Sequence, residues 1–244
     1  MSNTTQTVTV QDMLTAGIHF GHKPSKKHPK MDRFVFGVRQ GINIIDLERS
    51  KEQLDTILPT IEEMAAMGKT ILFLGTKRQA QAIVKAAAER IGMPYITERW
   101  LGGLLTNYGH VGNLMKKLTQ LKSERDQGLW QDRYTKKEQL MFEREIEDLT
   151  KVVGGVEQMI KLPDAVFVVD CKKEKTAIKE ANRMHIPVIA MVDTNVNPEK
   201  VTYPIPGNDD GVKSITYIVE QVAAAVERGK ARIPLNQAVV TNQS

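Results

Sequence analysis

The sequence AVFVVDCKKEKTAIKEANRMHIPVIAMV, residues 165–192, contains the clearest pattern of secondary structure in the chain. Two runs of five apolar residues, 165–169 and 188–192, enclose a more polar segment, and the sequence predicts a helix over 174–184. Short and wholly apolar runs are typical of strands that are buried on both faces. A helix between two such strands is the crossover that parallel strands need. The stretch therefore predicts a strand–helix–strand unit of a parallel sheet.

The same alternation continues on both sides of this unit. Upstream, a strand is predicted over 70–74, a helix over 79–91 that ends at Gly92, and a brief strand over 95–96; downstream, a last helix covers 211–228. Strands that alternate with helices predict an α/β fold, with a parallel sheet covered by helices on both faces.

The N-terminal region departs from this pattern. A short helix is predicted over 12–18, and the segment 21–30, with two prolines and no periodicity, is predicted to be a loop. Two short apolar runs, 34–38 and 42–45, indicate a β-hairpin before a helix that begins after Asp46.

The middle of the chain, 104–160, predicts an inserted antiparallel helical hairpin. Apolar residues recur in steps of three and four along two segments separated by a turn at 126–130, which is the seam pattern of a coiled coil. The predicted seam residues are Val111, Leu114, Leu118 and Leu121 on one helix, and Phe142, Ile146, Leu149, Val153, Val156 and Ile160 on the other. The hairpin is either a contact device for protein or RNA, or a spacer.

Composition excludes several classes of protein. The 244 residues are 41% apolar, which is enough to build a core, and the single cysteine, Cys171, excludes an internal disulfide framework. Apolar runs of five residues are far short of the roughly 20 that a membrane span needs. The N-terminus lacks the pattern of a signal peptide. We therefore expect a soluble, cytoplasmic protein.

The formal net charge of +5 is concentrated near the N-terminus. Residues 1–40 hold two acids, Asp12 and Asp32, and six bases: Lys23, Lys26, Lys27, Lys30, Arg33 and Arg39. A basic segment on a nearly neutral body predicts a contact surface for a polyanion, and a solvated loop is the alternative. Only 5% of the residues are aromatic, which argues against a surface that stacks bases.

Polar side chains follow several predicted strands. Gly75, Thr76, Lys77 and Arg78 lie between a strand and a helix, where a phosphate of RNA or of a nucleotide would be bound. Asp170 and Asp193 also follow predicted strands, where α/β proteins bind ligands. A cytosolic enzyme or sensor with a phosphorylated ligand is therefore a competing hypothesis. The alternative role of these two acids is to cap the next helix or turn.

The acids near the end of the sheet also suggest a weak cation site. Asp193, Asp209 and Asp210 are expected at one edge of a parallel sheet, where their carboxylates can converge on a divalent cation. N-capping of the last helix by Asp209 is the alternative.

Six short motifs give the chain a family resemblance. They are AGIHFGH (16–22), GTKR (75–78), RWLGGLLTN (99–107), LPDAVFVVD (162–170), VDTN (192–195) and PIPGNDD (204–210). In this order, from about residue 8 to residue 229, the chain closely resembles the bacterial small-subunit ribosomal protein S-two family. The extension after Gly229 departs from the family pattern.

The resemblance implies a flavodoxin-like body with an inserted helical hairpin, no catalysis and no required cofactor. It implies that 8–103 and 161–229 form the body and that 104–160 are the hairpin. The segment 230–244 has little periodicity and is expected to be a mobile tail. The resemblance further implies that the protein binds small-subunit rRNA and other small-subunit proteins, and that it helps to recruit the large mRNA-binding S-one protein. Neither membrane binding nor a small-molecule substrate is expected. A scaffold that binds proteins alone is a third hypothesis.

Residues expected to contact RNA come from the basic segment and from the motifs. They are Lys23, Lys26, Lys27, His28, Lys30, Arg33, Arg39, Lys77, Arg78, Arg99 and Asn107. Trp100 belongs either to the core or to the contact surface, and Asn107 is also a candidate cap for the first helix of the hairpin. Cations neutralise phosphates, and specificity would follow from the folded shape of the RNA.

Overall fold

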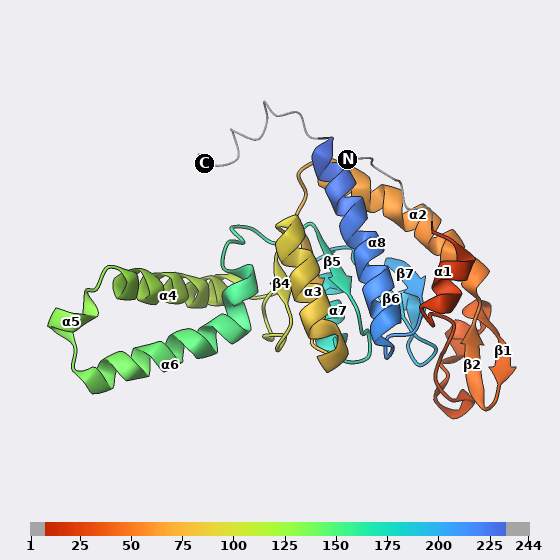
Figure 1. The fold of residues 1–244 in the computed structure, drawn as a ribbon, viewed down its shortest axis with the longest axis horizontal. Coiled ribbons are helices and arrows are strands. Elements are labelled where there is room, and N and C mark those ends of the chain that lie inside the picture. The colour runs from red at the N-terminus through yellow and green to blue at the C-terminus, as the bar shows by residue number, and fades with distance from the viewer. Residues whose placement is uncertain (1–7, 233–244) are drawn as a thin grey trace.

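The computed structural model describes residues 8–232, and its elements follow the predicted alternation (Figure 1). The helices are α1 (Val10–Thr15), α2 (Leu47–Ala66), α3 (Arg78–Ile91), α4 (Tyr108–Asp126), α5 (Trp130–Arg133), α6 (Lys136–Val153), α7 (Lys175–Arg183) and α8 (Val212–Ala231). The strands are β1 (Val35–Arg39), β2 (Ile42–Ile45), β3 (Ile71–Leu74), β4 (Tyr95–Ile96), β5 (Ala165–Val168), β6 (Val188–Val192) and β7 (Tyr203–Pro206).

A five-stranded parallel sheet forms the centre of the body, in the order β4-β3-β5-β6-β7. One face packs against α2, α3 and α8, where Phe73 and Phe167 are wholly buried. The other face packs against α7 and the segment 100–105, with Leu72 and Val168 among its buried residues. Both faces are covered, as the continuous apolar runs predicted.

Local chemistry sets the ends of the helices. The Asp46 side chain accepts hydrogen bonds from the backbone N–H groups of Glu48 and Arg49, which caps α2. Gly92 ends α3 in the left-handed conformation, at a φ of 59°, where a side chain would be strained.

The edge strand β7 is missing from the sequence prediction. Pro204 and Pro206 lie within it, and proline ordinarily argues against a strand. Because β7 pairs only with β6, the missing N–H groups are tolerated at the edge. In the N-terminal region the predicted hairpin forms as β1 and β2, and the predicted loop contains two short 3-10 helices, η1 (Pro24–Lys26) and η2 (Pro29–Phe34).

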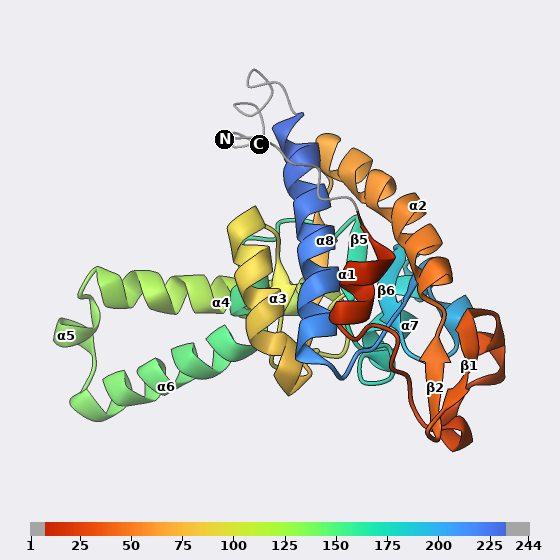
Figure 2. The same ribbon diagram turned by 45° about the vertical axis from the view of Figure 1, so that its right-hand side comes forward.

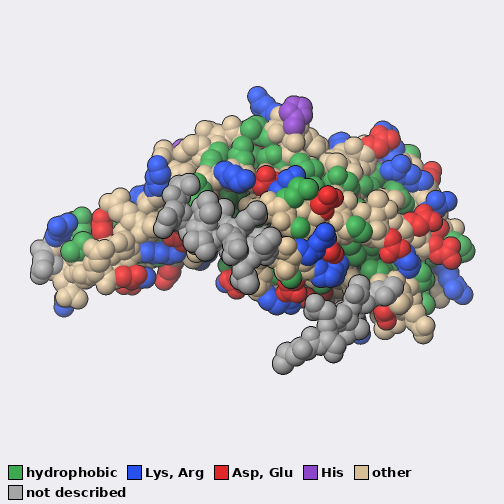
Figure 3. Space-filling model, turned by 90° about the horizontal axis from the view of Figure 1, so that it is seen from above, with side chains coloured by type: hydrophobic (Ala, Val, Ile, Leu, Met, Phe, Trp, Pro, Cys, Tyr) green, Lys and Arg blue, Asp and Glu red, His purple; other side chains and the backbone are tan. Residues whose placement is uncertain are grey.

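Helices α4 and α6, joined through α5, run out from the body side by side (Figures 1 and 2). Val111, Leu118 and Ile146 are buried along this arm, as the seam pattern predicted. One seam prediction is wrong: Ile160 is 87% exposed because α6 ends at Val153. Leu114 is half-buried and packs against the core, and Met115, which was not predicted, is buried beside it. Acidic and basic side chains are interspersed on the arm (Figure 3).

The C-terminal segment is helical for longer than predicted. Helix α8 extends to Ala231, so the first residues of the predicted tail belong to it, and 233–244 lie outside the described residues. Among the described residues, no helix combines the length and the apolar composition that a membrane span requires.

Candidate functional site

Charged side chains converge where the parallel strands end. The loop after β3 supplies Lys77, and the N-terminal segment supplies His22 from outside the sheet. The acids come from the ends of β5, β6 and β7: Asp170, Asp193, Asp209 and Asp210. We refer to these six residues as the charged cluster.

Lys77 is the centre of the charged cluster. Its Nζ lies 2.8 Å from a carboxylate oxygen of Asp209, 2.7 Å from one of Asp210 and 3.3 Å from one of Asp170. Burial opposes the charge, but these hydrogen bonds and ion pairs outweigh it and hold the pKa of Lys77 above its ordinary value. The ammonium is therefore compensated, and the geometry does not favour the predicted RNA contact of Lys77.

Asp209 and Asp210 differ in their surroundings. Asp209 is buried, and desolvation together with the neighbouring acids raises its pKa to about 7. Asp210 is exposed; burial opposes its ionisation, but the hydrogen bond from Lys77 outweighs this and lowers its pKa. Asp209 does not cap α8, since Gly211 holds the cap position and the Asn208 side chain accepts from the N–H groups that precede the helix.

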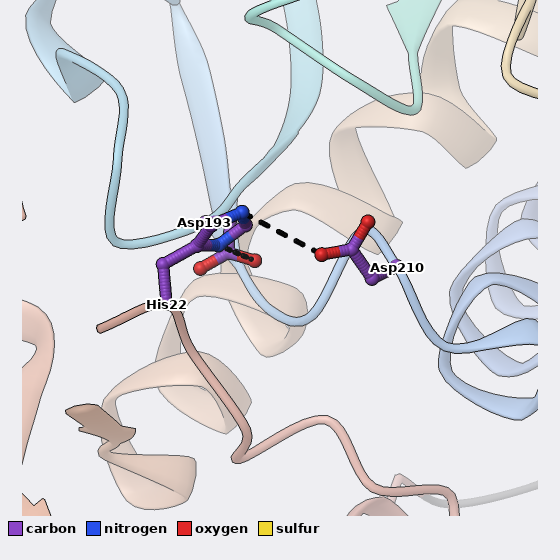
Figure 4. Close-up of side chains that lie close together, drawn as sticks. All are labelled: His22, Asp193 and Asp210. Carbon is purple, nitrogen blue, oxygen red and sulfur yellow. Dashed lines mark ion pairs between the residues drawn. The ribbon is translucent and has the colours of Figure 1, made fainter. Parts of the chain in front are cut away.

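His22 bridges two acids of the charged cluster (Figure 4). Its Nδ1 lies 2.9 Å from Asp193 and its Nε2 lies 3.5 Å from Asp210. The hydrogen bond to Asp193 raises the pKa of His22. One atom from each of the three side chains lies within 4.8 Å of the others, a set that could hold a metal ion. This set differs from the predicted cation ligands Asp193, Asp209 and Asp210, because His22 takes the position expected for Asp209.

Polar groups at the rest of the strand edge are bonded to one another within the chain. Thr76, a residue of the predicted phosphate loop, donates hydrogen bonds from its backbone N–H and its hydroxyl to the carboxylate of Glu174. Asp170 accepts from the N–H groups of Lys172 and Lys173, at 2.9 Å each, and so caps the turn before α7. The thiol of Cys171 is buried, and burial raises its pKa well above the usual range.

The basic N-terminal segment, residues 22–33, is fixed to the end of β6. The N–H of His22 donates to the Thr194 hydroxyl at 2.9 Å, and the N–H of His28 donates to the Thr194 carbonyl at 2.8 Å. Met31 lies wholly in the core, and the His28 ring accepts from the N–H of Lys30. His28 therefore has a local structural role at the start of η2.

The cations of the basic segment fall into two groups. Lys27 pairs with Asp32 at 2.6 Å, and Lys30 pairs with Glu199. Exposed cations without an ion pair among the described residues are Lys23, Lys26 and Arg33 in the segment, with Arg39 at the hairpin turn and Arg78 at the start of α3.

The motif at 99–107 is organised by a buried acid that the sequence did not single out. Glu180 of α7 accepts hydrogen bonds from the Trp100 indole at 3.1 Å, from the Gly103 N–H at 2.8 Å and from the Leu105 N–H at 3.1 Å. Trp100 is a core residue, with 9% of its surface exposed, while Arg99 and Asn107 are exposed. Asn107 occupies the cap position of α4 but makes no capping hydrogen bond through its side chain.

The comparisons with known proteins agree on one family. The model of the family described as ribosomal protein S2 matches residues 13–229. The chain belongs to this ribosomal protein S2 family. It is 46% identical to the small ribosomal subunit protein uS2 of Campylobacter curvus over 224 residues, which are 92% of this chain and 85% of that protein. The same protein of Campylobacter fetus is 44% identical over 92% of this chain and 86% of its own length, and that of Acidothermus cellulolyticus is 44% identical over 91% and 81%.

Membership of the S2 family makes the chain a ribosomal protein of the small subunit, a structural component of a ribonucleoprotein that acts in translation. The resemblance predicted from the six motifs is confirmed, and so is the α/β body with its parallel sheet. The residues that sequence reasoning missed, the pairing of Lys77 with the acids and the role of Glu180, are contacts between segments far apart in the chain.

Proposed function

We propose that this S2-family protein binds small-subunit rRNA through the basic N-terminal segment, in the cytoplasm and without catalysing a reaction. The observation that carries the proposal is a set of exposed cations on a well-fixed backbone. Lys23, Lys26 and Arg33 have no ion pair among residues 8–232, and Thr194 and Met31 hold the segment against the body.

Polyelectrolyte physics gives the mechanism. Each cation that meets a phosphate releases a condensed counterion, so affinity falls as salt rises. Such contacts position the protein, and the folded shape of the RNA supplies specificity. Arg39, Arg78, Arg99 and Asn107 are exposed and extend the proposed surface, whereas Lys27 and Lys30 contribute less because each already has an acidic partner.

The test is incorporation into small subunits. A tagged chain should co-sediment with small subunits at low salt and be released at high salt. Charge reversal of Lys23, Lys26 and Arg33 together should reduce occupancy at least about tenfold, since three phosphate contacts are lost. The matched control reverses three exposed lysines elsewhere on the body, Lys69, Lys85 and Lys213. Equal occupancy for the two variants would contradict the proposal.

We further propose that protein partners, including the S-one protein, dock beside the β-hairpin. Phe36 is 79% exposed, Val38 57% and Phe20 47%, and exposed apolar side chains of this kind are suited to a protein contact. Phe36→Ser with Val38→Ser should lower the amount of S-one protein retained by purified subunits, whereas the equally exposed Met67→Ser should not. Unchanged retention would remove this assignment.

The division of the chain belongs to the same proposal. Residues 8–103 and 161–229 would form the body, and 104–160 would form an inserted coiled-coil arm that contacts RNA or protein. A chain in which a short linker replaces 108–153 should keep the cooperative unfolding of the body. Loss of that transition would show that the arm is part of the core.

A divalent cation at His22, Asp193 and Asp210 is a second proposal, which rests on their ligand atoms lying within 4.8 Å of one another. An imidazole with two carboxylates is a donor set that zinc accepts. Metal analysis of desalted protein should find the ion, and Asp210→Asn should reduce it while the exposed Asp32→Asn should not. Desalted wild-type protein without zinc or magnesium would contradict the proposal.

A further inference from the structure

The outward face of α7 carries only positive charge. Lys172, just before the helix, and Lys175, Lys179 and Arg183 within it are all exposed, and none forms an ion pair among the described residues. The acids of the same stretch, Glu174 and Glu180, point inward and are buried. Four uncompensated cations therefore lie on one short helix.

Stability of the helix does not explain this pattern. Lys175, Lys179 and Arg183 are spaced at i, i+4 and i+8, so like charges face each other along the helix, which is unfavourable. Lys172 and Lys175 also lie at the N-terminal end, where the helix dipole disfavours cations. A solvated helix ordinarily mixes charges of both signs, as the arm does (Figure 3).

One short element lies between this face and the basic N-terminal segment. Next to α7 lies the 3-10 helix η4 (Pro198–Lys200), since the Asn182 side chain donates to the carbonyl of Lys200 at 2.9 Å. Glu199 of η4 pairs with Lys30. On the inner side of α7, Glu180 holds the loop that contains Gly103, which follows the exposed Arg99.

We propose that the outward face of α7 is a second RNA-binding surface, which binds phosphates of the small-subunit rRNA next to those bound by the N-terminal segment. Lys175, Lys179 and Arg183 rise about 6 Å per step of four residues, so they form a row along the helix. Lysine is depleted in protein interfaces, whereas clustered lysine and arginine are the signature of phosphate contact. The proposal rests on the proposed function and extends it to a surface that the motifs did not include.

The test uses small-subunit rRNA extracted from purified subunits, with affinity measured over a range of salt concentrations. Lys175→Glu, Lys179→Glu and Arg183→Glu are combined, and the Lys69, Lys85 and Lys213 reversal is the control of equal charge. We expect a dissociation constant at least about tenfold higher for the α7 variant, and a salt slope lower by about 2 to 3. The neutral variant Lys175→Gln, Lys179→Gln, Arg183→Gln should lie between it and the wild type.

The outcomes separate this inference from the proposed function. If the α7 variant binds rRNA like the control while the Lys23, Lys26 and Arg33 variant is weakened, the inference fails and the proposed function stands. If the wild type shows no salt-sensitive binding, both fail. If the α7 variants bind rRNA normally but enter subunits poorly, the face contacts a protein and the inference is overturned.

Discussion

Glu180 shows how much one buried carboxylate can organise. It accepts hydrogen bonds from Trp100, Gly103 and Leu105, and so fixes the motif at 99–107 to α7. Without the acceptor, these buried donors lose their partners, at a cost of about 1–3 kcal/mol for each donor left unpaired. The residue is therefore structural, although it lies in a segment rich in exposed cations.

Replacing Glu180 should destabilise the body strongly. Glu180→Ala should lower the free energy of unfolding by about 3 kcal/mol, and Glu180→Gln, which keeps one oxygen acceptor, by less. Urea unfolding followed by tryptophan fluorescence measures the change, because Trp100 reports on the loop. The exposed Glu143→Ala on the arm should stay within about 0.5 kcal/mol of wild type. An equal, small effect at both positions would contradict the role of Glu180.

Lys77 supports a pH-dependent prediction. Lys77→Met leaves the buried Asp170 and Asp209 without their cation, and breaking such a buried pair costs about 3–5 kcal/mol. Burial raises the pKa of Asp209 to about 7, so its charge is present above that pH and is lost as pH falls. Destabilisation should therefore be largest at pH 8 and smaller at pH 5, as measured by urea midpoints.

The control for Lys77 is the exposed Lys85→Met, which should show little change at either pH. A loss of stability that was the same at both pH values would mean that Asp209 does not titrate as its burial requires.

The packing of the arm depends on one row of buried side chains between α4 and α6. Leu118→Asp should place an unpaired carboxylate between α4 and α6, since Leu118 is fully buried. Amide hydrogen exchange should become faster in α4 and α6 and remain slow in β3, β5 and β6. Leu140→Asp, at a position on α6 that is 51% exposed, is the control. Unchanged protection in the arm after Leu118→Asp would refute this packing.

The base of the arm depends on a close approach of two backbones. A Cβ added at Gly155 would lie 2.2 Å from the carbonyl oxygen of Tyr95, whereas one added at Gly112 in α4 would meet nothing within 4 Å. Gly155→Ala should lower the melting temperature by several degrees, and Gly112→Ala should be neutral or stabilising by up to about 1 kcal/mol. Equal effects of the two substitutions would contradict this geometry.

Sequence periodicity predicted the elements well where local chemistry decides them. Continuous apolar runs gave β3, β5 and β6, and Asp46 and Gly92 marked helix ends correctly. Two failures have physical causes. The prolines of β7 are tolerated because that strand lies at an edge, and the seam pattern was extended to Ile160 although Gly154 and Gly155 end the helix.

The candidate site was less predictable than the fold. Sequence position places acids at the strand ends, but not the pairing of Lys77 with three of them or the approach of His22 from a distant segment. The position of His22 follows from the packing of the N-terminal segment against Thr194. The sequence alone therefore does not show which cations remain without an ion pair; that follows from the folded structure.

Helix α7 and the basic segment pack in the same hydrophobic cluster on one face of the sheet. Helices α2, α3 and α8 cover one face of the sheet (Figure 2). Helix α7 and the segment 100–105 pack against the opposite face. Two groups of cations on adjoining elements then make separate contributions to RNA affinity, because counterion release adds over the phosphates that are contacted.

Additivity is the quantitative prediction of this arrangement. A protein that combines the N-terminal reversal (Lys23, Lys26, Arg33) with the α7 reversal (Lys175, Lys179, Arg183) should lower the salt slope by the sum of the two separate decreases, about 4 to 6. The free energies of binding lost should add within about 0.5 kcal/mol if the two surfaces act independently. A combined effect no larger than that of either variant alone would contradict independent surfaces. It would mean that the two surfaces bind RNA together, so that the loss of one already releases the other.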